Sequence, residues 1–142
     1  HWERAIATLR DVERLRTRIL EKRPTDAMYR TGVAWTQDRI AEVLQTKGRI
    51  RGLLEHCRRV VFDRERLRDC GVDWEDRLAL AYAARAEASE KAGDHLEAAA
   101  DWERAIAELG NLEPAPQGAA DHLERWRQQL AAARSKAAVS NR

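Results

Sequence analysis

The sequence predicts an all-α fold in which about six helices form antiparallel hairpins that stack on one another. Apolar residues recur at spacings of three and four along every long segment, which is the period of an amphipathic helix. Ala, Leu, Glu and Arg dominate the composition, whereas Val, Ile, Tyr and Phe, which favour strands, are sparse. Seven glycines and three prolines leave only short breaks among 142 residues, and short connections make consecutive helices antiparallel neighbours.

The first predicted helix covers residues 1–23 and carries an apolar stripe from Trp2 to Leu20. Pro24 ends this helix, because proline lacks the backbone N–H that a helix interior requires. The amphipathic pattern is already under way at Trp2, and the chain begins without Met. We therefore expect the chain to be a piece of a longer protein.

Residues 26–70 are predicted to form a hairpin of two helices. Thr25 or Asp26 can cap the first of them, since a side-chain oxygen at this position accepts a hydrogen bond from an unpaired backbone N–H. Gly48 fits the turn between them, because glycine adopts the left-handed conformation without a steric cost. The second helix of the hairpin is expected to end near Cys70.

Residues 73–110 are predicted to form a second hairpin that turns at Gly93. Asp73, with an acidic residue three positions on, is expected to begin a helix that carries Trp74. Asp94 is expected to cap the helix that follows the turn, again with an acidic residue three positions on.

The segment 113–118 contains two prolines and a glycine, and it is the one stretch with the composition of a linker. A last helix is predicted over 119–138, with a possible cap at Asp121. From Ser135 onward the apolar content falls, so we expect the end of this helix to fray.

The hexapeptide Trp-Glu-Arg-Ala-Ile-Ala occurs at residues 2–7 and again at 102–107, which indicates an internal repeat. The surroundings of the second copy resemble a tetratricopeptide repeat: Ala98 and Trp102 have the spacing of the small and aromatic residues of its second helix, and Gly93 closes its first helix. The residues placed by this resemblance in the packing between helices are Gly48, Tyr82, Ala86, Gly93, Ala98, Trp102 and Ala105.

The resemblance implies a single domain over residues 1–142, wound as a right-handed superhelix. Residues 1–23 would be the second helix of a truncated repeat, 73–110 the best-matching repeat, and 119–138 a capping helix. The step from Gly48 to Gly93 is longer than the roughly 34 residues of this family and also suits a HEAT-like repeat, so a HEAT-like array or an irregular helical bundle is the alternative.

The sequence contains no arrangement typical of an enzyme, a metal site or a cofactor site. His56, Cys57, Cys70 and His95 match no zinc-ligand spacing, and we expect Cys57 in the core and the histidines at the surface or partly buried. Two cysteines without a disulfide framework suggest a reducing compartment, hence a cytoplasmic location. No apolar run approaches the roughly 18 residues of a membrane span.

The resemblance implies a peptide-binding groove lined by the first helix of each pair. Its acidic side chains favour a basic peptide, and the Lys, Asn and Arg clamp that the family uses for acidic peptide ends is missing. The residues expected to line the groove are Trp35, Asp38, Glu42, Gln45, Ala83, Glu87, Glu90 and Lys91.

The function that this pattern predicts is a protein-interaction module inside a larger bacterial signalling or regulatory protein. One alternative is a purely structural segment that packs on neighbouring domains, which a large exposed apolar patch at the N-terminal end would favour. Another is nucleic-acid binding through the arginines between residues 49 and 68, although interleaved acidic residues make a solvated face of ion pairs the simpler interpretation. Trp35 and Trp74 fit the apolar stripes less well than the other tryptophans and are candidates for exposed binding anchors.

Overall fold

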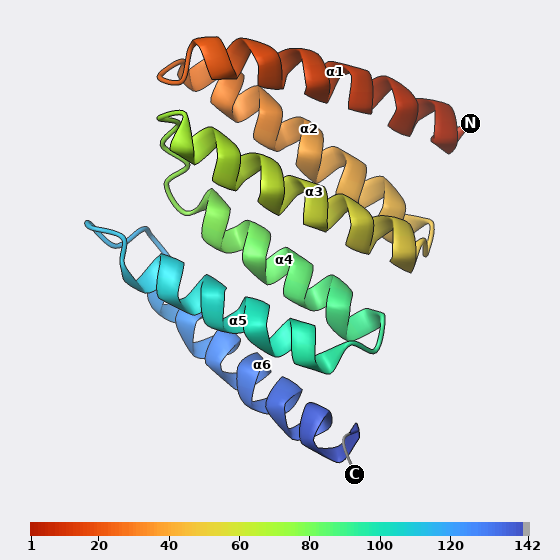
Figure 1. Cartoon of the computed structure of the whole chain (residues 1–142), viewed down its shortest axis with the longest axis vertical. Helices are drawn as coiled ribbons and strands as arrows, with labels where there is room; N and C mark the ends of the chain where they lie inside the picture. Colours follow the sequence, from red (N-terminus) through yellow and green to blue (C-terminus); the bar gives the residue numbers. More distant parts are fainter. Residues whose placement is uncertain (141–142) are drawn as a thin grey trace. The chain divides into compact units, whose positions relative to one another are not determined.

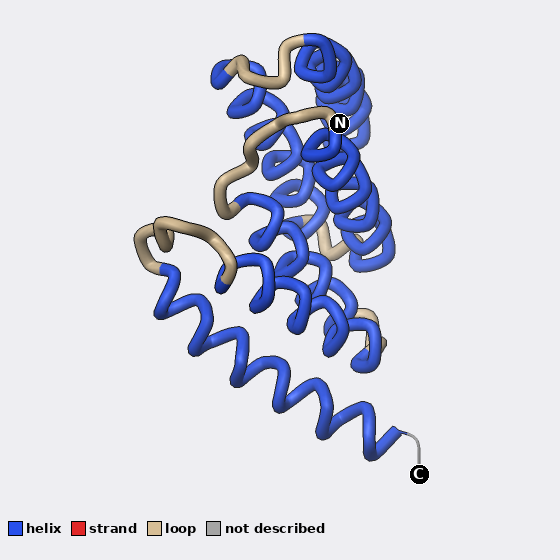
Figure 2. Tube along the Cα trace, turned by 60° about the vertical axis from the view of Figure 1, so that its left-hand side comes forward, coloured by secondary structure: helices blue, strands red, loops and turns tan. Residues whose placement is uncertain are grey.

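Helices make up most of the computed structural model, which describes residues 1–140 (Figure 1), and none of these residues forms a strand (Figure 2). The prediction of an all-α fold with six helices is confirmed for these residues. The six helices are α1 (Trp2–Lys22), α2 (Ala27–Thr46), α3 (Ile50–Asp69), α4 (Arg77–Lys91), α5 (His95–Gly110) and α6 (Ala119–Ser140).

The helices belong to two compact units, His1–Trp74 and Glu75–Arg142. In the first unit, α2 packs against both α1 and α3; in the second, α5 packs against both α4 and α6. Consecutive helices within each unit run antiparallel (Figure 1), as the short connections predicted. The superhelical arrangement and the single domain over residues 1–142 stay predictions.

Two helix starts are fixed by the aspartates that the sequence indicated. The Asp26 carboxylate accepts hydrogen bonds from the backbone N–H groups of Met28, at 3.0 Å, and Tyr29, at 3.3 Å. The Asp94 carboxylate accepts one from the backbone N–H of Glu97 at 3.1 Å. Each carboxylate thus satisfies N–H groups that have no partner inside the helix.

Two turns depend on glycine, as predicted. Gly48 has φ +66° and Gly93 has φ +83°, so both occupy the left-handed region that other residues enter only with strain. An added Cβ at Gly93 would meet no atom within 4 Å, so backbone strain is the main penalty for a larger residue there.

We therefore expect Gly93→Ala to lower the free energy of unfolding by about 1 kcal/mol. Gly110→Ala is a matched control, since Gly110 has helical backbone and equally open surroundings. This control should be neutral or slightly stabilising, because alanine favours helix more than glycine does. Urea denaturation of both variants measures the difference, and equal effects would contradict the role of the positive φ.

The predicted start of the fourth helix is wrong. Asp73 and Trp74 lie before α4, which begins at Arg77. The Trp74 indole N–H donates to the backbone carbonyl of Arg64 at 2.7 Å, and the Arg30 guanidinium donates to the Asp73 carbonyl at 3.0 Å. These bonds lie within the first unit, which ends at Trp74, and they give the polar groups of Asp73 and Trp74 partners outside a helix.

The last helix is longer than predicted at its end. Instead of fraying from Ser135, α6 continues through Ser140, because Ala133 and Ala137 on one of its faces are buried. Its start at Ala119 agrees with the predicted boundary. The remaining part of the expected frayed tail, Asn141 and Arg142, lies outside the described residues.

The core of the second unit is made of small residues around a buried tryptophan. Ala86, Ala98 and Ala105 have no exposed surface, and Trp102 is almost fully buried beside them. Small residues let helices approach closely, and the indole fills the space that remains. The tetratricopeptide resemblance assigned these four residues to packing positions.

One acidic side chain is fully buried in the second unit. The Asp101 carboxylate accepts two hydrogen bonds from the Arg85 guanidinium, both at 2.7 Å, and one from Arg104 at 2.8 Å. The Arg85 side chain is 18% exposed and the Asp101 side chain 0%. A forked arginine–carboxylate pair of this kind links α4 to α5, with its carboxylate fully shielded from water.

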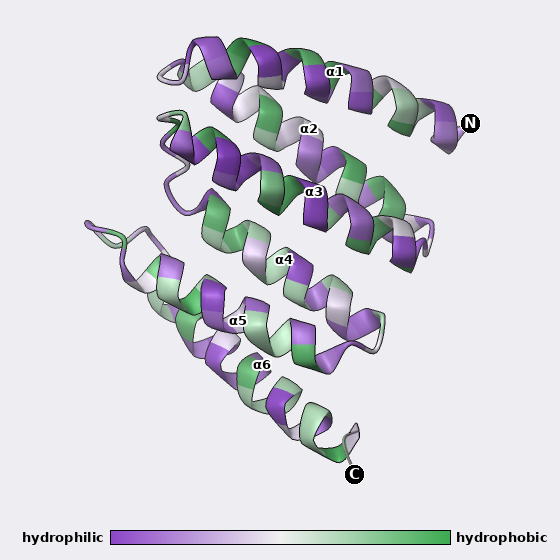
Figure 3. Cartoon of the chain, in the orientation of Figure 1, coloured by the Kyte–Doolittle hydropathy of each residue, from purple (hydrophilic) through white to green (hydrophobic). Residues whose placement is uncertain are grey.

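The two copies of the hexapeptide do not bury the same positions. In the second copy Trp102 and Ala105 are buried, whereas in the first copy Trp2 is half-buried, Ala5 is exposed and Ile6 is the buried residue. Figure 3 shows hydrophilic and hydrophobic residues alternating along α1, which carries the first copy. Identical sequence therefore gives two amphipathic helix segments that pack through different faces.

Candidate functional site

Six residues form an exposed stripe along one face of α2. Their spacings of three and four residues place them one above another on the helix, and all six are exposed. The α2 stripe consists of Met28, Thr31, Trp35, Asp38, Glu42 and Gln45. It contains all four α2 residues that the sequence assigned to a peptide groove, and its apolar members lie toward the helix start.

A hollow of about 500 Å³ lies at the apolar end of this stripe, between α1 and α2. The side chains around it are mostly apolar, and two of them are unusually open to solvent: Met28 is 70% exposed and Trp35 is 56% exposed. The residues that line this Trp35 hollow are Arg16, Met28, Tyr29, Thr31, Gly32 and Trp35. Large apolar side chains exposed around a concavity are typical of a binding surface.

A hydrogen-bonded arginine fixes one wall of the Trp35 hollow. The Arg16 guanidinium of α1 donates to the Gly32 carbonyl at 3.1 Å and to the Thr36 hydroxyl at 2.7 Å. A Cβ on residue 32 would lie 3.3 Å from Arg16 Cδ, so glycine gives the arginine room to approach α2. Two hydrogen bonds to α2 therefore fix the position of Arg16 at the wall of the hollow.

The acidic end of the α2 stripe is partly neutralised. The Asp38 carboxylate lies 3.7 Å from the guanidinium of Arg64, and Glu42 pairs with Arg39 at 2.8 Å. Both acidic side chains stay largely exposed and can exchange these partners for others. Surface pairs of this kind contribute roughly 0–1 kcal/mol, so a basic ligand can compete for the carboxylates.

The other four residues of the predicted groove lie on α4, in the second unit. Glu87 and Lys91 are exposed, whereas Ala83 is buried. Glu90 is half-buried and interacts with His95 at 3.3 Å and Lys136 at 3.5 Å. That all eight residues line one groove stays a prediction.

A buried polar cluster lies between α2 and α3. His56 is 1% exposed, and its Nε2–H donates to the backbone carbonyl of Gln37 at 2.8 Å. The Gln37 side-chain oxygen accepts a hydrogen bond of 3.0 Å from Arg64, whose guanidinium also lies over the Trp74 ring at 5.5 Å. The expectations of a surface histidine at position 56 and of an exposed anchor at Trp74 are therefore wrong.

The imidazole of His56 is held in its neutral form. Burial lowers its pKa from 6.5 to about 4, even though the hydrogen bond to the Gln37 carbonyl favours the proton, and the nearby arginines lower it further. His56 Nδ1 has no hydrogen-bond partner among the described residues, so a second proton would be buried without an acceptor.

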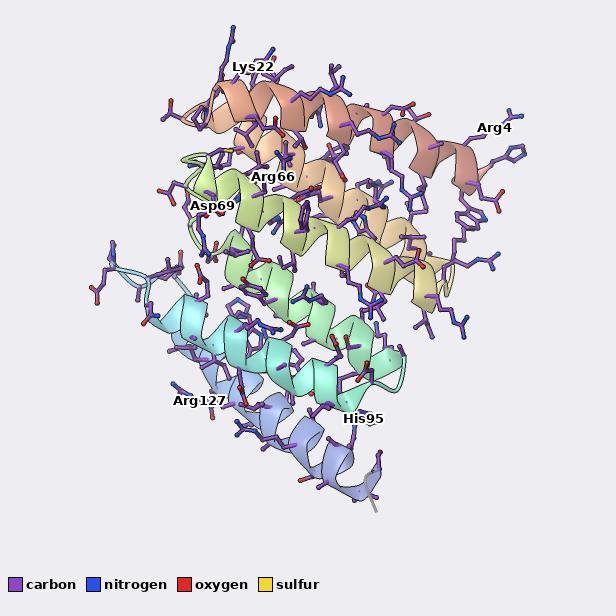
Figure 4. The ribbon with its side chains drawn as sticks, viewed as in Figure 1. Arg4, Lys22, Arg66, Asp69, His95 and Arg127 are labelled. Atoms are coloured by element: carbon purple, nitrogen blue, oxygen red, sulfur yellow. The ribbon has the colours of Figure 1, made fainter. Side chains whose placement is uncertain are left out.

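The predicted basic face of α3 loses two of its arginines. Arg64 is buried in the polar cluster, and Arg66 lies on the side of α3 that faces α1 (Figure 4), where it pairs with Glu21. Four other arginines of α3 remain exposed, namely Arg51, Arg58, Arg59 and Arg68. This leaves fewer cations for a continuous phosphate-binding surface than the sequence indicated.

No cluster of three or more His, Cys, Asp or Glu side chains that could hold a metal ion occurs within residues 1–140. Cys57 is buried, as expected, and Cys70 is exposed, and neither forms a disulfide.

A scan against protein-family models found no matching family, and searches of curated proteins and of solved structures found no similar chain. Among the described helices, none combines the length and the apolar character needed to cross a bilayer.

The burial of Gln37 and Arg64 was not predicted, although the sequence pattern contains a signal for it. Gln37 lies on the apolar stripe of α2, between Val33 and Ile40, at spacings of four and three. Arg64 likewise lies on the apolar stripe of α3, three residues after Val61 and three before Leu67. A polar residue at a stripe position predicts burial with partners, and this criterion would have identified both.

Proposed function

We propose that this chain is a protein-interaction module whose Trp35 hollow binds an apolar side chain from a peptide segment of a partner. The observation that carries the proposal is the exposure of Met28 and Trp35 around a concavity of about 500 Å³. Tryptophan and methionine are enriched in binding surfaces, where burying them on association releases water from a large apolar area. In this proposal the chain is a tetratricopeptide-like module of a cytoplasmic bacterial signalling or regulatory protein.

The chemistry of the α2 stripe favours a partner with an apolar anchor followed by basic residues. A concavity of this size can hold one aromatic or branched aliphatic side chain. Asp38 and Glu42 follow Trp35 at the next positions of the stripe and can attract a lysine or arginine of the same segment. The apolar anchor would supply most of the affinity, and the charged pairs would set orientation and association rate.

A peptide selection tests this proposal. A random library of 15-residue peptides is panned against the intact chain, and the affinities of selected peptides are measured by calorimetry. Trp35→Ala should weaken binding at least tenfold, because truncating a central anchor costs roughly 2 kcal/mol or more. Phe62→Ala is the matched control, since Phe62 is an aromatic residue that is 65% exposed on α3, away from the hollow.

The proposal fails if selected peptides bind the Trp35→Ala variant as tightly as the unchanged chain. It also fails if the Phe62→Ala variant loses as much affinity, because the hollow would then carry no specific part of the binding. Peptides without an apolar residue among the selected sequences would contradict the anchor itself.

The two alternatives have less support than the hollow. A nucleic-acid surface on α3 would have to do without Arg64 and Arg66. A structural segment was expected to expose a large apolar patch near the N-terminal end. On α1, however, the exposed Leu15 lies in a pocket whose other lining residues, Asp11, Arg14 and Arg18, are charged.

A further inference from the structure

A second cavity, of about 200 Å³, lies between α1 and α3 in the first unit, away from the Trp35 hollow. Its lining is polar, in contrast to the hollow. From α1 it is lined by Glu13, Thr17 and Glu21, from α3 by Asp63 and Arg66, and at its edge by the exposed Arg14 and Arg18. We refer to it as the Glu13 pocket.

Two side chains of the Glu13 pocket are buried without a hydrogen-bond partner. Glu13 and Thr17, one helical turn apart, are each 7% exposed. Neither Glu13 Oε2 nor Thr17 Oγ1 has a partner among the described residues. A buried acceptor without a donor is costly, so the pocket favours a ligand that donates hydrogen bonds.

The carboxylates of Glu13 and Asp63 are the groups in the pocket that favour a cation over an anion. Burial and then the Asp63 carboxylate raise the pKa of Glu13, while Arg59, Arg10 and Arg14 act in the opposite direction. Burial likewise raises the pKa of Asp63. Two poorly solvated carboxylates close enough to repel each other are relieved by a positive charge between them.

Three of the four other charged side chains that line the pocket already have partners. Arg66 pairs with Glu21 across the cavity, and Arg14 pairs with Asp11 at 3.5 Å. Arg18 lies at the exposed edge. The buried interior of the pocket therefore offers the unpartnered oxygens of Glu13 and Thr17. Its carboxylates do not form a group that could hold a metal ion, since no such group of three or more His, Cys, Asp or Glu side chains occurs among the described residues.

We infer that the Glu13 pocket binds a guanidinium group, either of a free organic cation or of an arginine side chain. A guanidinium carries five N–H donors in one plane, which suits a carboxylate and a hydroxyl that lie side by side and a second carboxylate opposite. A cavity of about 200 Å³ holds this group with little space to spare. The inference uses residues other than those of the Trp35 hollow, so either proposal can fail without the other.

Calorimetric titration of the intact chain with methylguanidinium tests the inference. Glu13→Gln keeps the shape of the side chain but removes its charge, and we expect it to weaken binding at least tenfold. Glu3→Gln is the matched control on the same helix, since Glu3 is exposed and does not line the pocket, and its affinity should stay within twofold. Arg18→Gln removes a positive charge from the edge and should tighten binding.

Two further ligands distinguish the source of the group. N-acetyl-arginine methylamide presents the same cation on a peptide unit, and its citrulline counterpart is the neutral control that should not bind. Tighter binding of the arginine amide than of methylguanidinium assigns the pocket to an arginine of a protein partner, and equal or weaker binding assigns it to a free cation.

Thermal unfolding gives a readout that does not depend on the ligand. Because the folded chain raises the pKa of Glu13, the carboxylate destabilises the fold above that pKa, and Glu13→Gln should raise Tm at pH 7 by an amount that shrinks as the pH falls.

Equal affinity of the Glu13→Gln variant and the unchanged chain for methylguanidinium would overturn the inference. Absence of binding to the unchanged chain, or preferential binding of inorganic phosphate, would do the same.

Discussion

Replacing Asp101 with alanine should lower the free energy of unfolding by about 3 kcal/mol, the largest effect expected of any single substitution considered for this chain. The Asp101 carboxylate is fully buried and accepts three hydrogen bonds from Arg85 and Arg104. Without it, the mostly buried Arg85 guanidinium loses the forked pair with this carboxylate, and removing one partner of a buried ion pair is strongly destabilising. Urea denaturation followed by circular dichroism measures the loss.

Two variants separate this explanation from a general weakening of α5. Glu103 on the same helix pairs with Arg134 at the surface, and Glu103→Ala should cost less than about 1 kcal/mol because water solvates both charges. The double variant Arg85→Leu with Asp101→Leu should recover much of the lost stability, since it leaves no buried charge unpaired. A double variant as unstable as Asp101→Ala would contradict the explanation.

Acidification from pH 7 to pH 4 should remove about 3 kcal/mol of stability through His56 alone. In the unfolded chain this histidine takes up a proton near pH 6.5, whereas in the folded chain its pKa is about 4. Between these values the unfolded state binds more protons, so its population grows as the pH falls. The contribution is fully present above pH 6.5 and declines down to about pH 4.

Urea denaturation at several pH values, with His56→Gln beside the unchanged chain, checks this expectation. Glutamine keeps an N–H donor for the Gln37 carbonyl but does not titrate in this range. Subtracting the stability of the His56→Gln variant at each pH also removes the opposite contribution of Glu13 and Asp63. The raised pKa values of these two groups favour the folded state as the pH falls. A difference between the two chains that does not change from pH 7 to pH 4 would show that His56 is not buried in its neutral form.

Local signals in the sequence were sufficient to predict most of the helix boundaries and turns. Asp26 and Asp94 cap helices, and Gly48 and Gly93 turn them, because each of these effects depends on a few neighbouring residues only. The start of α4 could not be found in this way. Trp74 lies outside any helix, and its indole N–H donates a hydrogen bond to the Arg64 carbonyl ten residues earlier. That contact depends on how α3 packs.

The candidate site was predicted in part. Trp35 was named for fitting the α2 core stripe poorly, and it is indeed exposed, but nothing local to it indicated a hollow. The hollow depends on Arg16 of the preceding helix, which approaches α2 at Gly32. The Glu13 pocket likewise joins residues fifty positions apart, Glu13 and Asp63, whose proximity follows only from the packing of the first unit.

The repeated hexapeptide has a consequence for any comparison of this chain with others. An alignment anchored on its two copies would pair the exposed Ala5 with the buried Ala105, and the half-buried Trp2 with the buried Trp102. Conclusions about evolutionary constraint drawn from those pairs would mix solvent-facing with interior positions. For helical segments of this kind, the face that is sequestered from water is a sounder basis for matching residue positions than the identity of the amino acids.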